Sequence, residues 1–132
     1  MRQFLLDTNI LSGLIKNPSG PVFRRLAPLN SNAFCTSILV AAEMRYGATI
    51  KRSPRLAKDV DEILRRIAVK AFESPADQRY AELRATLEAR GDQLAANDTL
   101  IAAHALALDC VLVTDHRAFS RVPNLTIENW LV

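Results

Sequence analysis

Four acidic residues occupy positions where the sequence predicts the end of a strand or part of a helix. They are Asp7 in FLLDTN, Glu43 in LVAAEMRYG, Asp98 in AANDTLIAAHA and Asp115 in VLVTDHRAF. Each follows or interrupts an apolar run, where an ionised side chain is costly unless a partner stabilises it. A divalent cation is the simplest partner that several converging carboxylates can share. The pattern therefore indicates an acidic centre that binds a metal ion.

Each acid also has an ordinary structural interpretation. Asp7 can be the N-cap of a helix, Asp98 can lie in the first turn of a helix, and Asp115 can be a turn residue after a strand. Glu43 is harder to explain in this way, because Leu39 and Tyr46 at helical spacing predict that it faces the interior. A buried carboxylate needs a cation or a hydrogen-bond donor, so Glu43 favours the metal hypothesis most.

Polar residues adjoin the acids and are candidates for supporting roles. Thr8 and Thr114 directly flank two of them, and their hydroxyls can orient a carboxylate or hold a metal-bound water. The candidates for substrate contact are Asn9, His116 and Arg117. His104 lies six residues after Asp98 and is expected to be a packed or hydrogen-bonded histidine.

Several other chemistries lack their sequence signature. No serine lies in a G-x-S-x-G setting, and there is no P-loop, Rossmann glycine fingerprint or zinc-type Cys/His spacing. A haloacid-dehalogenase-type phosphatase needs an acid two residues after the first, where this chain has Asn9. A phosphoacceptor receiver domain needs an acidic pair after the first strand and a late lysine, and neither is found.

The elements that position these residues alternate along the chain. Strands are predicted over 3–6, 33–36, 69–72, 111–114 and within 125–131, and helices over 10–16, 22–29, 38–47, 54–66, 75–90 and from Asn97 onward. Strands joined by helical crossovers imply an α/β fold with a mostly parallel sheet covered on both faces. Asp7 and Asp115 follow strands directly, and ligands of such sheets bind beyond the carboxyl ends of the strands.

Length and composition indicate a single domain spanning residues 1–132, with 49% hydrophobic residues and a net charge of +3. No apolar run is long enough to span a membrane, and Asp7 interrupts the first one, which argues against a signal peptide. Two cysteines in apolar runs are expected to be reduced core thiols, which suits the cytoplasm. Eight basic residues between Arg45 and Lys70 form either a solvated helical face or a phosphate-binding surface.

Three blocks resemble the PIN-domain family, specifically the VapC-type toxin ribonucleases of bacterial toxin–antitoxin pairs. They are LLDTNILSGLIK, AAEMRYGA and ANDTLIAAHALALDCVLVTDHRAFSRVPNLTIENW, in that order. The resemblance implies a three-layer α/β/α sandwich that binds Mg²⁺ or Mn²⁺ through Asp7, Glu43, Asp98 and Asp115. It also implies RNA as substrate, with tRNA among the candidates, a homodimer, and neutralisation by a small VapB-like antitoxin.

The chain departs from the family pattern in TDHRAF, where many relatives have Asn-Asn after the threonine and an acid at the position of Ala118. Asp115 retains a possible ligand there. The chemistry implied is metal-assisted hydrolysis of a phosphodiester, with Asp7 and Asp98 as direct ligands. The alternative is a regulatory nucleic-acid-binding module with an acidic metal site and no significant catalysis. RNA cleavage that requires Mg²⁺ or Mn²⁺ separates the two.

Overall fold

The chain folds around a five-stranded sheet in which all neighbouring strands are parallel, and the structure, a computed structural model, describes residues 2–132. The strands are β1 (Phe4–Leu6), β2 (Phe34–Ser37), β3 (Ala68–Lys70), β4 (Val111–Val113) and β5 (Ile127–Glu128). Their spatial order is β3-β2-β1-β4-β5, so β1 is central. Leu5 of β1 pairs with Cys35 on one side and with Leu112 on the other.

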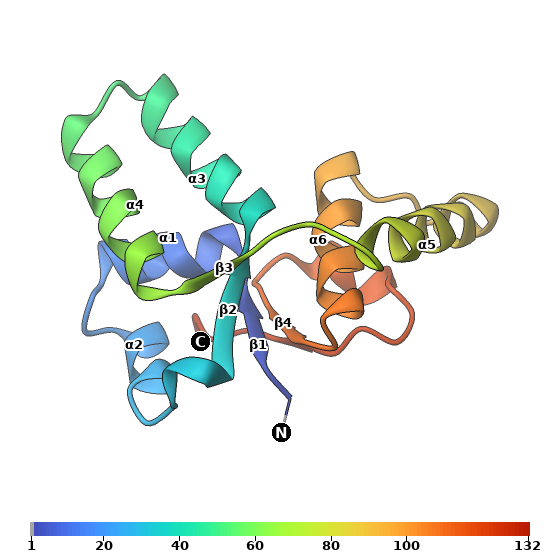
Figure 1. The fold of residues 1–132 in the computed structure, drawn as a ribbon, viewed down its shortest axis with the longest axis horizontal. Coiled ribbons are helices and arrows are strands. Elements are labelled where there is room, and N and C mark those ends of the chain that lie inside the picture. Colours follow the sequence, from blue (N-terminus) through green and yellow to red (C-terminus); the bar gives the residue numbers. More distant parts are fainter. Residues whose placement is uncertain (1) are drawn as a thin grey trace.

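Helices cover both faces of this sheet. They are α1 (Thr8–Lys16), α2 (Pro21–Leu26), α3 (Ile38–Ile50), α4 (Pro54–Arg66), α5 (Ala76–Arg90) and α6 (Ala96–Ala107), with short 3-10 turns at Ser31–Ala33 and Arg117–Arg121. Figure 1 shows the sheet between α1, α2 and α4 on one side and α5 and α6 on the other. The expected three-layer α/β/α architecture with a parallel sheet is therefore confirmed.

The core forms where strand and helix side chains meet. Leu5, Leu6 and Leu112 of the central strands are fully buried, and Trp130 near the carboxyl end of the chain closes the core against Phe4, with 5.0 Å between ring centroids. Burying a leucine of this kind contributes about 1.5–3 kcal/mol. Both cysteines are free and buried, as expected of core thiols. Within residues 2–132, no helix combines the length and apolar character needed to cross a membrane.

Several predicted helix boundaries are wrong, among them the end of the helix predicted over 22–29, since α2 ends at Leu26, and the start of the helix predicted over 10–16, since α1 begins at Thr8. Helix α3 does not end near Gly47 but continues to Ile50, because this glycine does not adopt the positive φ that terminates many helices. Helix α6 begins at Ala96, so Asn97 lies inside its first turn and is not its cap. By contrast, α5 ends as predicted at Gly91, whose φ of 70° is left-handed.

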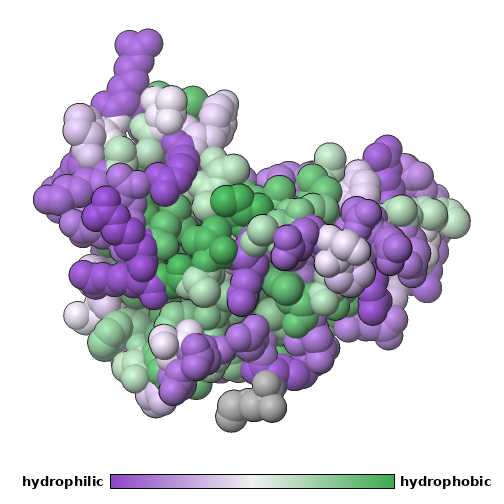
Figure 2. All heavy atoms as spheres, in the orientation of Figure 1, coloured by the Kyte–Doolittle hydropathy of each residue, from purple (hydrophilic) through white to green (hydrophobic). Residues whose placement is uncertain are grey.

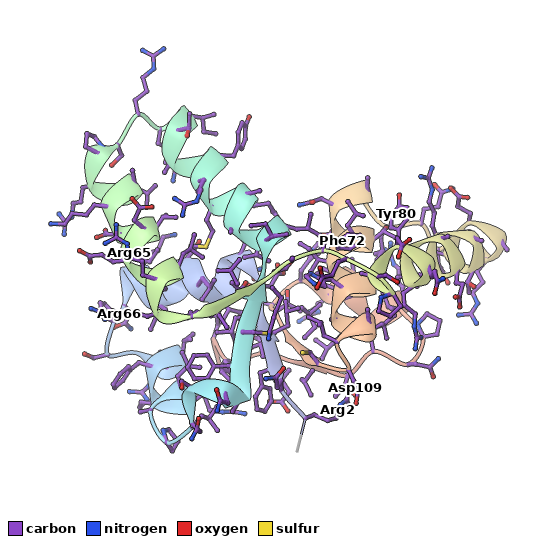
Figure 3. All side chains as sticks on the ribbon, viewed as in Figure 1. Arg2, Arg65, Arg66, Phe72, Tyr80 and Asp109 are labelled. Atoms are coloured by element: carbon purple, nitrogen blue, oxygen red, sulfur yellow. The ribbon has the colours of Figure 1, made fainter. Side chains whose placement is uncertain are left out.

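The apolar side of α4 packs into the core. Val60, Ile63 and Leu64 are buried, so most of this apolar stripe is covered by the rest of the chain. Arg65 and Arg66 lie on the outer side of the helix near its carboxyl end (Figure 3). Figure 2 shows hydrophilic side chains over the outer side of the lobe formed by α3 and α4, with hydrophobic residues in the hollow between this lobe and α5 and α6.

Candidate functional site

Asp7 is fixed at the carboxyl end of the central strand. Its backbone N–H donates to the carbonyl of Val113 at 2.9 Å, so β4 ends beside it. Its carboxylate accepts one hydrogen bond from the N–H of Thr8 and another from Thr114 Oγ1, each at 2.8 Å. Thr114 Oγ1 in turn accepts the N–H of His116 at 3.0 Å. Asp7 is therefore both the N-cap of α1 and a carboxylate held from two sides.

Burial raises the pKa of Asp7, a residue that is only 6% exposed. The hydrogen bonds from Thr114 and Thr8 stabilise the charged form and partly offset this rise, while the negative charge of Asp98 adds to it. An N-cap with no further role gains nothing from burial beside another carboxylate. The position of Asp7 therefore favours the functional interpretation over the purely structural one.

Glu43 reaches the same region from α3, whose first turn is capped by Ser37. Burial raises its pKa, and the negative charges of Asp7 and Asp98 raise it further. Asn97 and, after it, Thr8 lie close enough to lower this pKa, yet Glu43 Oε1 is buried without a hydrogen-bond partner of proper geometry among residues 2–132. The inward orientation predicted for Glu43 is confirmed for this oxygen.

Glu43 and Tyr46 do not share one inward face of α3, although their spacing predicts that they do. Tyr46, used as a marker of the inner face, is 65% exposed. Arg45 pairs with Asp61 at 2.6 Å and so does not neutralise Glu43. The carboxylate of Glu43 is thus left without a cation in the part of the chain that the structure describes.

Asp98 and Asp115 approach from α6 and from the turn after β4. Asp98 Oδ2 lies 3.1 Å from Nε2 of His116, which is an ion pair when the imidazole is protonated. The exposed carboxylate of Asp115 accepts a hydrogen bond from the side-chain amide of Asn9. These two acids therefore each have one neutral or titratable partner, and neither is paired with a lysine or arginine within residues 2–132.

A cavity of about 530 Å³ joins the four acids. Its lining consists of Asp7, Thr8, Asn9, Ser12, Gly13, Lys16, Glu43, Asp98, Asp115, His116 and Leu131. Thr114 supports Asp7 from behind this lining, and Arg117 is exposed outside it. The predicted acids thus lie together, although the first and the last, Asp7 and Asp115, are 108 positions apart along the chain.

Ser12 and Lys16 were not singled out from the sequence, although a pattern for them exists. They follow Thr8 at intervals of four residues, which places all three on one side of α1. When a site residue begins a helix, the residues four and eight positions later lie on the same side of that helix and face the same cavity. Lys16 is the only lysine or arginine in the described lining of the acidic cavity.

His104 lies outside the site and is a packed histidine, as expected. Its ring is buried, with Nδ1 2.7 Å from Ser37 Oγ and Nε2 3.1 Å from the carbonyl oxygen of Ala71. Phe72, which lies next to α6 in Figure 3, contacts its edge with 5.3 Å between centroids. Burial lowers the pKa of His104 and favours the neutral ring.

The donor chemistry of the cavity suits a hard cation. Carboxylate and hydroxyl oxygens dominate it, and Thr8 Oγ1, Asn9 Oδ1 and Glu43 Oε1 are buried without hydrogen-bond partners among residues 2–132. In their present rotamers, however, no three acidic, histidine or cysteine side chains within residues 2–132 form a closed ligand set. Asp98 Oδ2 and Asp115 Oδ1 are the carboxylate oxygens engaged by His116 and Asn9 respectively.

Comparison with known proteins gives a consistent result. Residues 4–125 match the family described as PIN domain. The chain is 35% identical to Ribonuclease VapC2 of Rickettsia felis, covering 96% of this chain and 97% of that protein. It is 33% identical to the tRNA(fMet)-specific endonuclease VapC of Salmonella typhimurium, covering 98% and 99%.

Solved structures agree with these relatives. DNA-bound VapBC from Salmonella typhimurium superposes with a TM-score of 0.88 at 32% identity, covering 98% of this chain and 99% of that chain. VapBC2 from Rickettsia felis, bound to a DNA fragment from its promoter, gives a TM-score of 0.85 at 33% identity, covering 96% and 98%. With its four acids around one cavity and these matches over nearly its whole length, the chain belongs to the PIN-domain family, among the VapC-type proteins.

Proposed function

We propose that this chain is a metal-dependent endoribonuclease, the toxin of a toxin–antitoxin pair. The observation that carries the proposal is the cavity in which Asp7, Glu43, Asp98 and Asp115 meet at the carboxyl edge of the sheet. Buried like charges with raised pKa values are costly to hold together without a function. Relatives over the full chain are named as ribonucleases and as an endonuclease specific for tRNA(fMet), which supports RNA, and tRNA in particular, as the substrate class.

The residues fit Mg²⁺ or Mn²⁺ better than zinc, because their donors are hard oxygens. Asp7 and Asp98 are proposed as direct ligands, with Glu43 and Asp115 binding the ion or its waters. Such an ion would supply Lewis acidity at a phosphoryl oxygen and a lowered pKa for a bound water.

The protein groups contribute orientation and proton transfer. Thr114 and the N–H of Thr8 hold both oxygens of Asp7, so this carboxylate cannot rotate freely. Glu43 Oε1 has no donor and a raised pKa, properties that suit a group accepting a proton from the attacking water. His116 beside Asp98 is placed to approach a substrate phosphate when protonated. Asn9, which binds Asp115, is proposed to brace the site and contact substrate.

An antitoxin is the proposed protein partner, because the solved relatives are VapBC complexes. The chain offers a suitable surface in an apolar groove of about 550 Å³ between α1, α2 and α4. Phe23 on this groove is 48% exposed, and Arg55, Asp59, Glu62 and Arg66 line its border. An apolar groove with both charge signs on its border matches an amphipathic protein segment. A basic residue of that segment could pair with the carboxylates and exclude metal.

A homodimer is also proposed, from the family resemblance. The exposed pair Tyr46 and Ile50 on α3 is the candidate for the contact. We place the protein in the cytoplasm, in keeping with its free thiols. Light scattering at tens of micromolar tests the dimer, and a strict monomer would remove it.

The enzyme proposal is tested with Asp7→Asn and Asp98→Asn. Both variants should fold, as judged by circular dichroism, and both should lose cleavage of RNA by at least about a hundredfold, in line with removal of a metal ligand or its support. Exposed Asp77→Asn on α5 serves as the matched control and should cleave like the wild-type protein. Full activity in either site variant would overturn the proposal, and RNA binding without cleavage by the wild type would support the regulatory alternative.

A further inference from the structure

A second, smaller cavity continues from the acidic one between α1, α3 and α4. Its volume is about 160 Å³, and four residues line both cavities: Thr8, Ser12, Lys16 and Glu43. The additional lining consists of Gly47 of α3, its C-cap Lys51, and an apolar floor formed by Ile15, Met44, Ala48, Leu56 and Val60. The two cavities therefore form one groove that starts at the carboxylates and leads away from them along α1 and α3.

Each of the two helices presents a regular strip to this groove. On α1 the strip is Thr8, Ser12 and Lys16, and on α3 and its cap it is Glu43, Gly47 and Lys51. Both strips have a spacing of four residues, begin next to the acidic centre and end in a lysine. A rise of 1.5 Å per residue places each lysine Cα about 12 Å along its helix from the first residue of the strip. The groove thus changes from negative to positive along its length.

The two lysines have no competing partner. Lys16 and Lys51 are exposed, and neither forms an ion pair within residues 2–132. By contrast, Arg45 on another side of α3 is engaged by Asp61. Free ammonium groups beside hydroxyls are suited to phosphate oxygens, which accept charge-assisted hydrogen bonds.

The glycine at position 47 is independent evidence for a ligand in this groove. Glycine inside a helix weakens it relative to alanine, and Gly47 lies well inside α3 without a positive φ. A Cβ added there would meet no atom within 4 Å, whereas one added to Gly13 of α1 would come within 2.7 Å of Leu131 Cδ2. The packing of this chain therefore explains Gly13 but gives no reason for Gly47. A ligand that lies against α3 in the groove would give one, because only glycine lets a backbone approach so closely.

We propose that this groove binds the sugar–phosphate backbone of the substrate RNA strand beside the scissile phosphate. Lys16 and Lys51 contact phosphate oxygens, and Gly47 leaves room for the strand to lie against α3. The inference rests on the proposed ribonuclease function and assigns its substrate track. The groove between α1, α2 and α4 differs in its charges, since Asp59 and Glu62 lie on its border together with Arg55 and Arg66. Of the two, the lysine-ended groove is the one that suits a polyanion.

The test measures binding separately from cleavage. A fluorescein-labelled single-stranded RNA and a labelled tRNA are titrated with protein carrying Asp98→Asn, and anisotropy is recorded at several salt concentrations. In that background Lys51→Ala should weaken binding about tenfold, the loss expected for one charged hydrogen bond. It should also reduce the slope of log K against log salt by about 0.7 on the single strand. Lys58→Ala removes the same charge from an exposed site outside the groove and should change neither value.

Gly47→Ala gives a sharper contrast. It should raise the thermal midpoint by roughly 2–5 °C, because helix propensity improves without a clash. It should nevertheless weaken RNA binding, and, in the otherwise wild-type protein, slow RNA cleavage, by about tenfold. If Gly47 were needed only for the packing of the fold, Gly47→Ala would lower the thermal midpoint. If Gly47 had no role, Gly47→Ala would leave RNA binding unchanged.

The outcomes distinguish this inference from the proposed function. Unchanged RNA binding in both Gly47→Ala and Lys51→Ala overturns the groove assignment even if the wild type cleaves RNA. If these substitutions weaken binding of the antitoxin and leave RNA binding unchanged, the groove is a protein site and the assignment is again overturned. If binding depends on the groove but the wild type cleaves no RNA, the substrate track stands as an RNA-binding site and the enzyme proposal fails.

Discussion

Replacing Glu43 by glutamine should stabilise the metal-free protein at neutral pH. Glu43 is partly buried, one of its oxygens lacks a donor, and the charges of Asp7 and Asp98 oppose its ionisation. The substitution keeps the shape of the side chain and removes its charge. Since the pKa of Glu43 is raised in the folded state, the ionised carboxylate destabilises the native protein relative to the unfolded chain.

The size of the effect follows from this linkage. Each unit of pKa rise corresponds to about 1.4 kcal/mol, and an unpaired buried polar group costs about 1–3 kcal/mol. Because Glu43 is only partly buried, solvent screens part of this cost, and we expect a net gain of about 1 kcal/mol. For a chain of this length that gain raises the thermal midpoint by roughly 3–5 °C.

The stability difference between Glu43→Gln and the wild type should depend on pH. Below 4.5, the ordinary pKa of Glu43, the side chain is protonated in both states and the two proteins should melt together. The difference should grow as the pH rises through the raised native pKa and then stay constant. Differential scanning calorimetry in EDTA from pH 4 to pH 8 measures it, with exposed Glu82→Gln on α5 as the matched control.

Adding Mn²⁺ should reverse the order. An ion at a concentration of about 100 times its Kd stabilises the wild type by about 2.7 kcal/mol. The variant lacks the negative charge of one of the four acids and should gain less. A Glu43→Gln protein that is less stable than the wild type in EDTA at pH 7 would refute the view that Glu43 is an uncompensated charge. Equal gains from Mn²⁺ would refute its part in metal binding.

Two further predictions concern supporting residues. Thr114→Val removes the donor to Asp7 and the acceptor of the His116 N–H, so RNA cleavage should fall about 10–100-fold. The acidic limb of the pH profile of cleavage should move to higher pH, because the hydrogen bond from Thr114 lowers the pKa of Asp7. An unchanged profile would show that Thr114 does not position Asp7. His104→Gln should flatten the loss of stability as the pH falls below 6.5, because burial lowers the native pKa of His104 and the charged ring is disfavoured. The cleavage rate per folded His104→Gln molecule should match the wild type, and a large loss would contradict the packing role.

The acidic centre was predictable because its location depends on simple geometry. Asp7 and Asp115 directly follow short apolar runs, and the carboxyl ends of parallel strands share one edge of a sheet. Glu43 was predictable as an acid inside an apolar helix, although Tyr46 misled the argument by facing solvent. The fold class followed from the alternation of strand and helix patterns.

Other features depend on tertiary contacts that local patterns do not contain. The sequence could not show that Gly47 continues a helix, since a glycine ends many helices and the open space beside it is visible only in the fold. It also could not show that the stripe on α4 is covered, because that depends on how α1 and α3 pack against it. Lys16 lies at the predictable four-residue spacing from Ser12, but its place in the lining of the acidic cavity becomes clear only from the fold.

The central claim is that metal bound by the four acids makes this chain a ribonuclease. The most direct test is the initial rate of tRNA cleavage by the purified, chelator-treated wild-type protein as Mg²⁺ is titrated. The account predicts no cleavage without metal, a saturable rise with Mg²⁺, and loss of activity on return to EDTA. Cleavage that persists at full rate in EDTA, or that never appears at millimolar Mg²⁺ or Mn²⁺ in a folded protein, would contradict it.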